Sequence, residues 1–166
     1  MATQLLINTE DLKRLSQLSG NIDDDKLIQY VKIAQDTQVK NYLGTDLLER
    51  FQAGLTASNL TTDETNLLND YIKDMVVHWT LVVALKFQPY TIANNGVFKK
   101  TSENAETVSK EEMDSIIQKH REVAVSYSDA FINYMCYNSS TFPEYDSNTD
   151  ADTDPRQKTN YISWVL

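Results

Sequence analysis

The chain has 166 residues, with 24 acidic and 15 basic side chains, a formal net charge of −9, four Gly, three Pro and one Cys. At this length a single domain can bury roughly 70% of the surface that its unfolded chain exposes, so neither a disulfide nor a metal is needed to hold it together. So few turn residues argue against an all-β sandwich or barrel and favour long helices. The acidic balance argues against a phosphate-tracking nucleic-acid surface, which needs clustered Lys and Arg.

The sequence gives no sign of export or membrane insertion. The N-terminus has no basic start and too short an apolar run for a signal peptide, and no window approaches 18 apolar residues. Cys136 has no second cysteine to pair with, which fits a reducing compartment without requiring one. We therefore expect a soluble protein that is not exported.

Two helices are predicted before Gly44. Asn8 can cap the first, which Gly20 closes, and Asp23 can cap the second, with Ile22 packing onto Leu27 as a hydrophobic staple. The apolar residues of the second helix recur mostly every three or four positions, which places them on one face. They are Leu27, Ile28, Val31, Ala34, Val39, Tyr42 and Leu43.

A short and a long helix follow. Thr45 can cap the short one, and Thr61 with Glu64 fits a capping box that opens the long one, which Pro89 stops. From Met75 to Phe87 the long helix is apolar nearly all round, so we expect it in the middle of a bundle. The residues predicted to be buried there are Met75, Val76, Trp79, Val82 and Val83.

A second capping box, Ser109 with Glu112, opens the last long helix. Its apolar stripe consists of Met113, Ile116, Ile117, His120, Ala124, Tyr127, Phe131, Tyr134 and Met135. Three long and two short helices predict an all-α helical bundle. Between the two longest helices, residues 90–100 carry Asn95-Gly96, a strong hairpin signal. An isolated hairpin is marginally stable in water, so it must lean on its own bundle or on another subunit.

The composition changes after Asn138, and we divide the chain into a helical domain, 1–137, and an acidic flexible tail, 138–166. The tail ends in an apolar, β-prone segment, which either folds back on its own bundle or docks on a partner as an added strand. We favour docking, since exposing these side chains invites aggregation. The residues expected to bind the partner are Tyr161, Ile162, Trp164, Val165 and Leu166.

The sequence contains no recognisable catalytic or metal-binding motif. Asp150, Asp152 and Asp154 resemble the start of a calcium loop, but the positions that need Gly and a bidentate acid hold Pro155 and Tyr161. His78 and His120 can face each other across the bundle, yet neither has an acid three residues before it, so both are interpreted as partly buried, hydrogen-bonded residues. We expect no enzymatic activity, metal or cofactor.

The order of these elements resembles the head-completion, or head-to-tail connector, proteins of tailed bacteriophages, over about residues 5 to 137. The most specific pieces are the junction from Tyr42 through Gly44 to Leu47 and the hairpin at Asn95-Gly96, followed by Ser102 and a capped helix. The resemblance implies a structural virion protein of the neck: a ring, of twelve subunits, that binds the portal protein and other neck or tail proteins.

Such a ring joins head to tail and lets DNA pass without sequence-specific binding, and an acidic surface repels phosphate at short range. In a ring, two different surfaces of each subunit meet. The hairpin of one subunit would then be stabilised by packing on the helices of the next. The residues expected at that interface are Ile92, Asn95, Gly96, Val97 and Phe98. Two alternatives stay open: a cytosolic helical adaptor that binds one partner through its C-terminal apolar segment, and an enzyme whose site is assembled from distant residues.

Overall fold

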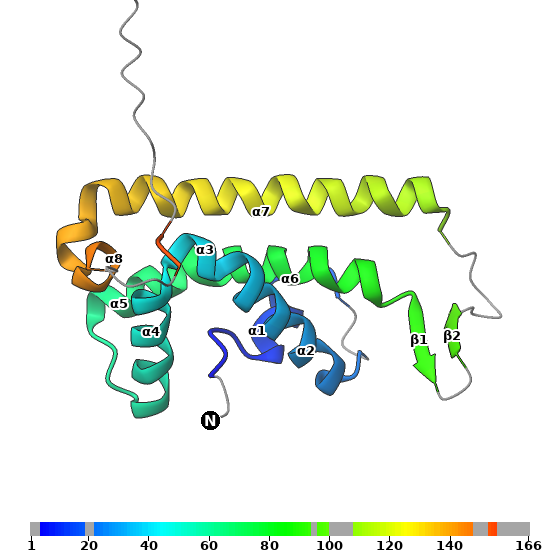
Figure 1. The fold of residues 1–166 in the computed structure, drawn as a ribbon, viewed down its shortest axis with the longest axis horizontal. Helices are drawn as coiled ribbons and strands as arrows, with labels where there is room; N and C mark the ends of the chain where they lie inside the picture. Colours follow the sequence, from blue (N-terminus) through cyan, green and yellow to red (C-terminus); the bar gives the residue numbers. More distant parts are fainter. Residues whose placement is uncertain (1–3, 19–21, 94–95, 100–107, 148–152, 156–166) are drawn as a thin grey trace, which may run out of the picture.

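The two longest helices lie antiparallel along the long axis of an elongated bundle (Figure 1). A computed structural model describes residues 4–18, 22–93, 96–99, 108–147 and 153–155. In it, α6 (Lys73–Phe87) contacts α7 (Lys110–Asn138) and α2 (Asp24–Ala34), so α6 is the central helix. The predicted all-α class is confirmed.

Two of the long helices contain a π-helical segment. α2 continues through η1 (Gln35–Val39) into α3 (Lys40–Leu43), and α5 (Thr62–Leu67) continues through η2 (Leu68–Ile72) into α6. With α7, these runs are the three long helices expected from the sequence. The shorter helices are α1 (Thr9–Arg14), α4 (Thr45–Ala57) and α8 (Pro143–Asp146).

The predicted helix starts are confirmed by their capping bonds. The side chain of Asn8 accepts the N–H of Asp11 at 2.6 Å, and that of Asp23 accepts the N–H of Asp25 at 3.2 Å. Both capping boxes are complete, with Thr61 and Glu64 opening α5 and Ser109 and Glu112 opening α7. Each cap satisfies amide groups that the helix itself leaves unpaired.

Three local predictions are wrong. α1 ends at Arg14, well before Gly20, and just beyond it the Ser16 hydroxyl accepts the Leu18 N–H, a local bond that competes with helix. Ile28 is 43% exposed because it lies about a quarter-turn from the stripe set by Leu27. Thr45 is the first residue of α4 and makes no capping bond there, since Gly44 occupies the N-cap position.

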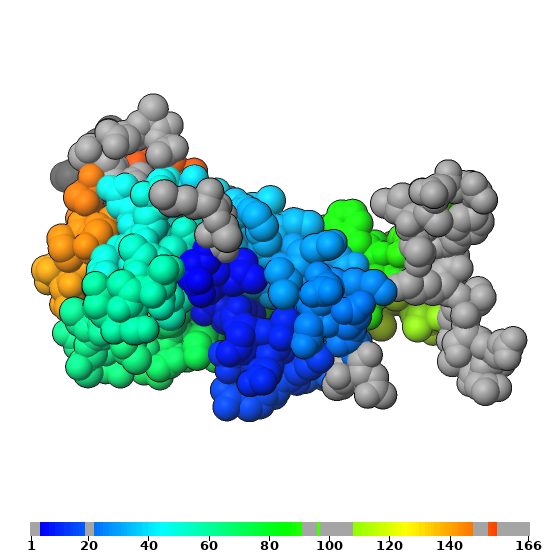
Figure 2. Space-filling view, turned by 90° about the horizontal axis from the view of Figure 1, so that it is seen from below, coloured from blue at the N-terminus to red at the C-terminus, as the bar shows by residue number. Residues whose placement is uncertain are grey.

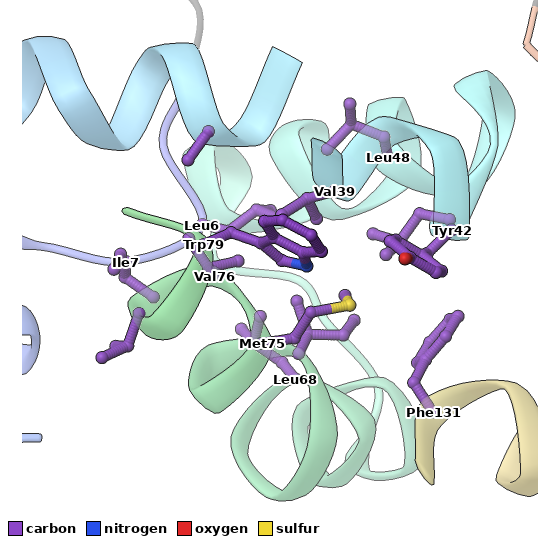
Figure 3. Close-up of a cluster of buried hydrophobic side chains, with 14 of the residues drawn as sticks. Leu6, Ile7, Val39, Tyr42, Leu48, Leu68, Met75, Val76, Trp79 and Phe131 are labelled. Carbon is purple, nitrogen blue, oxygen red and sulfur yellow. The ribbon is translucent and has the colours of Figure 1, made fainter. Parts of the chain in front are cut away.

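The hydrophobic core is built around α6, as the sequence predicts. Met75, Val76, Trp79, Val82 and Val83 are all buried. Figure 3 shows part of this cluster, in which side chains of α6 meet residues of the N-terminal segment, the α2–α3 run, α4 and α7. The Trp79 indole N–H donates to the Ser128 hydroxyl at 3.1 Å, and that hydroxyl donates to the Ala124 carbonyl at 2.8 Å. The α6–α7 contact therefore includes one satisfied buried polar network.

The N-terminal segment is also part of the core. The fully buried side chain of Gln35 accepts the N–H of Leu6 at 3.0 Å and donates to the carbonyl of Gln4 at 3.3 Å. These two bonds fix the backbone of the segment, and its Leu6 and Ile7 side chains are buried in the core. Figure 2 shows the segment, α1 and α2 in the middle of one face of the molecule, beside α4.

Two four-residue strands lie between α6 and α7. β1 (Tyr90–Ala93) and β2 (Gly96–Lys99) pair antiparallel, with Ile92 opposite Val97 and Ala93 opposite Gly96. They are at the end of the bundle opposite α4, α5 and α8 (Figure 1). Within the described ranges, no helix combines the length and apolarity needed to cross a membrane.

The prediction that the chain becomes a flexible tail after Asn138 is wrong for residues 139–146. This stretch forms a 3-10 turn, η3 (Ser139–Thr141), and α8. Phe142 and Tyr145 are buried, and the Tyr145 ring meets the Phe131 ring edge-on at 6.0 Å. These two aromatic residues sit among polar neighbours in sequence, so composition alone misses their burial.

Candidate interaction surfaces

The two histidines meet across the α6–α7 contact, as predicted. The His78 ring lies between two rings of α7, with its centroid 6.1 Å from that of His120 and 5.2 Å from that of Tyr127. The Nδ1 atom of His78 is buried and has no hydrogen-bond partner among the described residues, so the prediction of a hydrogen-bonded histidine is wrong at this atom. Among the described residues, no three His, Cys, Asp or Glu side chains gather into a group that could hold a metal ion.

Burial disfavours the charged form of both imidazoles. It is the main cause that lowers the pKa of His78, with the nearby His120 adding to the effect and Asp74 opposing it. Burial likewise lowers the pKa of His120. Both rings are therefore held neutral to a lower pH than in the unfolded chain.

We expect the protein to lose stability as the pH falls through about 6.5, where histidines of the unfolded chain take up protons first. His78 and His120 are the two histidines of the sequence, so they dominate titration between about pH 7.5 and 5.5. Tm measured across this window should fall toward acid. In the double variant His78→Phe with His120→Phe, which keeps rings in place, the decline should flatten. An unchanged decline would show that other groups cause it.

A line of half-buried side chains marks the open edge of the α6–α7 contact. On α7 these residues recur every seven positions, as Met113, His120, Tyr127 and Tyr134. Opposite them lie Tyr71, His78 and Leu85, also seven apart, and the Tyr71 and Tyr134 ring centroids are 4.5 Å apart. At the strand end, this edge runs into a cavity of about 230 Å³ that Leu85, Tyr90 and Met113 help to line.

A second feature is the strap, residues Thr153–Pro155, which crosses the start of α4. The Thr45 N–H donates to the Thr153 carbonyl at 3.1 Å, and the Thr153 N–H donates to the Thr45 hydroxyl at 3.2 Å. Pro155 lies over Gly44, where an added Cβ would come within 2.9 Å of the proline Cδ. The strap therefore holds the chain at Thr153–Pro155 against the start of α4.

The sequence-predicted interface residues are only partly described. Ile92, Gly96, Val97 and Phe98 lie in the two strands, whereas Asn95 lies outside the described residues. The C-terminal residues Tyr161, Ile162, Trp164, Val165 and Leu166 also lie outside them, as do Asp150 and Asp152. The strap and the open edge were not predicted, because each depends on contacts between residues far apart in the sequence.

The sequence profile of a family of unknown function, DUF6712, matches residues 39–155. The chain belongs to this family. The match begins at the end of η1 and runs through α8 to Pro155 of the strap, so the family's common region includes both sides of the strap contact. It also crosses the boundary at residue 138 that composition suggested. No curated protein and no solved structure matches the chain.

Proposed function

We propose that this protein is a structural component of the neck of a tailed bacteriophage, where copies form a ring under the portal that joins head to tail. The observation that carries the proposal is the order of elements: an Asp-capped helix ending at Gly44, a central apolar helix, a paired-strand segment and a long capped helix. This is the order on which the resemblance to head-to-tail connector proteins rests.

The placement of the elements suits head-to-tail assembly. The strands and the strap lie toward opposite ends of the elongated bundle (Figure 1). A ring is built from heterologous contacts, in which two different surfaces of each copy meet. We assign the segment carrying Ile92, Asn95, Gly96, Val97 and Phe98 to one of these surfaces.

The surroundings of the strands support this assignment. Two paired strands of four residues are at best marginally stable alone in water. Phe87 and Tyr90 at their base are each 54% exposed, and Val108 across from them is 42% exposed. Apolar side chains exposed around a marginal sheet are typical of a surface that another chain covers.

The C-terminal segment supplies the second surface in this proposal. The strap holds the chain at Pro155, and Tyr161, Ile162, Trp164, Val165 and Leu166 follow within a few residues. We assign these five to binding of the portal or another neck protein. In this role the ring has no catalytic activity, and its acidic surface, from a net charge of −9, keeps passing DNA from adhering.

The experiment that tests the proposal is assembly with portal rings of the phage that encodes this chain. The full-length protein and purified portal should co-sediment, and electron microscopy of the complex should show added density as a ring on one face of the portal. A monomeric or dimeric protein that never joins portal, at micromolar concentration and physiological salt, would contradict the proposal and favour the cytosolic adaptor.

Deleting residues 161–166 should weaken attachment to the portal by at least tenfold while Tm changes by less than about 2 °C. Burying one Trp and several aliphatic side chains contributes roughly 1.5–3 kcal/mol each before ordering costs, so their loss is measurable. Co-sedimentation and calorimetry check the two parts. Substituting only Ser163, which contributes little apolar area, is the control. A fall in Tm of several degrees would instead place the segment in the protein's own core.

A further inference from the structure

The two ends of the bundle differ in charge. Residues 75–102, which run from α6 through both strands, contain Lys86, Lys99 and Lys100 and no acid. Residues 139–155, which include α8 and the strap, contain five acids and no base. The strands lie at one end of the bundle, and α4 and α8 lie at the other (Figure 1). The acid-free run and the base-free run are therefore kept apart within one copy.

The strand end, which we define as β1, β2 and the last turn of α6, is only partly covered by its own chain. Among the described residues, the extensive contact of each strand is with the other strand and not with a helix. Lys86 is exposed, and Phe87 and Tyr90 are each 54% exposed. The adjoining first turn of α7 adds Lys110 and two acids, of which Glu112 is held in its own capping box. Exposed apolar side chains among lysines fit a partner surface that is acidic.

The acidic end, which we define as α4, α8 and the strap, has the opposite composition. These elements contain five acids and a single base, Arg50, whose Nε lies 2.7 Å from a carboxylate oxygen of Glu64. Glu49 on α4 and Asp146 on α8 are exposed, and α4 packs against α8. Because its one base is already paired, this end presents net negative charge to a partner.

A cavity of about 230 Å³ opens at the start of α4. A lysine side chain that enters a cavity needs an apolar wall for its methylene stem and a carboxylate for its ammonium group. Leu48 supplies the first and Glu49 the second, whereas Asp36 is already bonded to Lys32. This combination suits a lysine that another chain supplies. The cavity is lined by Asp36, Lys40, Thr45, Leu48, Glu49 and Gln52.

From these observations we propose that the strand end of one copy binds the acidic end of the next copy, with Lys86 and Lys99 placed against Glu49 and Asp146. The complementary charges belong to one sequence, and each copy carries one end of each kind. Two different surfaces that meet in this way add copies head to tail until a ring closes. The inference rests on the proposed ring, whose two contacting surfaces it names, and it leaves residues 161–166 to the portal.

The net charge of −9 on every copy does not prevent this contact. At physiological salt the screening length is about 8 Å, so the repulsion between whole copies is weak. Lysine and carboxylate groups in contact lie well within that length and still attract. The occupant of the strand end must be a protein with an exposed acidic surface, and each copy of this chain provides one.

The first test reverses the charge of one end at a time. Sedimentation equilibrium of the full chain at physiological salt should show association that increases with concentration. The strand variant, Lys86→Glu with Lys99→Glu, should weaken this association at least tenfold, and so should the acidic-end variant, Glu49→Lys with Asp146→Lys. A wild-type protein that stays monomeric up to about 300 μM would overturn the inference, as would an acidic-end variant that associates normally.

Matched controls separate the contact from a change in net charge. Lys119→Glu with Arg121→Glu changes the net charge as much as the strand variant does, and Glu122→Lys with Asp129→Lys as much as the acidic-end variant. All four positions are exposed on α7, outside both ends. Each control should change the association less than threefold, and losses equal to those of the test variants would contradict the proposed contact.

An equimolar mixture of the strand variant and the acidic-end variant tests whether the two ends meet each other. In the mixture, the native strand end of one variant faces the native acidic end of the other, and the two reversed ends attract in the same way. Association should therefore return to within about threefold of the wild-type level. Two variants that remain monomeric when mixed would show that these ends bind something other than each other.

Zero-length cross-linking identifies the residues in contact. A carbodiimide joins a lysine amine to a carboxylate that touches it, as an amide with loss of water. In a mixture of ¹⁵N-labelled and unlabelled wild-type protein, peptides carrying Lys86 or Lys99 should be joined to peptides carrying Glu49 or Asp146, with one label on each side. The absence of such mixed-label links would overturn the inference.

Assembly on portal rings separates this contact from the proposed neck function. A ring that forms on the portal equally well with the strand variant would overturn the inference and leave the neck function standing. A wild-type protein that associates through these two ends but never joins the portal would support the inference and contradict the neck function. If the strand variant loses portal binding but keeps self-association, the strands bind the portal and the inference is wrong.

Discussion

Replacing Val83 with Asp is expected to unfold the protein or lower its Tm by about 10–20 °C. Val83 lies on the central helix and is 8% exposed, in a core that also holds Trp79 and Val82. A carboxylate there loses its hydration without gaining a partner, which costs several kcal/mol against a total stability of about 5–15 kcal/mol. For a chain of this length, each kcal/mol shifts Tm by about 2–4 °C.

Thermal denaturation followed by circular dichroism checks this result. Val125→Asp is the matched control, because Val125 is 38% exposed on α7 and its substitution should cost no more than about 0.5 kcal/mol. Similar losses in both variants would mean that helix propensity, not core burial, determines the effect. A Val83→Asp protein with an unchanged Tm would show that α6 is not the centre of the core.

The sequence was sufficient to predict α6 because its signals are local. A helix that is apolar on all sides is expected in the middle of a bundle. A capping box at Thr61 marks the start of the continuous helix that leads into α6. The same reasoning found the start of α7 at Ser109 and the end of α3 before Gly44. Where a cap, a stripe and a breaker agree, periodicity identifies the element and its buried face.

The features that sequence reasoning missed depend on distant contacts. Gln35 reads as an ordinary polar helix residue, yet its buried amide holds the backbone of Gln4 and Leu6 about 30 positions earlier. Thr153 bonds to Thr45 across 108 positions, and an acidic surrounding sequence gives no hint of it. Each pairing uses a side chain or a backbone group whose partner is unknowable before the fold is known.

The candidate interaction surfaces also include some features that the sequence predicts and others that it does not. That His78 and His120 meet was predictable, because both lie on apolar faces of the two longest helices. The cavity that Leu85, Tyr90 and Met113 help to line was not, since it depends on how the two helices and the first strand are placed relative to one another. The strand and C-terminal residues assigned to partners remain predictions, which the assembly experiments test.

Replacing Gly44 with Ala is expected to cost about 2–4 kcal/mol and to detach the strap from α4. Gly44 has φ 78° and ψ 170°, a region of backbone conformation that is essentially restricted to glycine, and forcing another residue into it costs about 1–3 kcal/mol. The new methyl group would also lie 2.9 Å from the Cδ of Pro155 and 3.2 Å from its nitrogen, so the strap must move.

The two contributions can be separated by a double-mutant cycle with Pro155→Gly, measured by urea denaturation. If the methyl group crowds the strap, Gly44→Ala should cost about 1 kcal/mol less in the Pro155→Gly background, because the ring it collides with is gone. The remaining cost then reports backbone strain at position 44. Strictly additive costs would mean that Pro155 does not rest on Gly44, and that the strap is held at α4 by the Thr45–Thr153 hydrogen bonds alone.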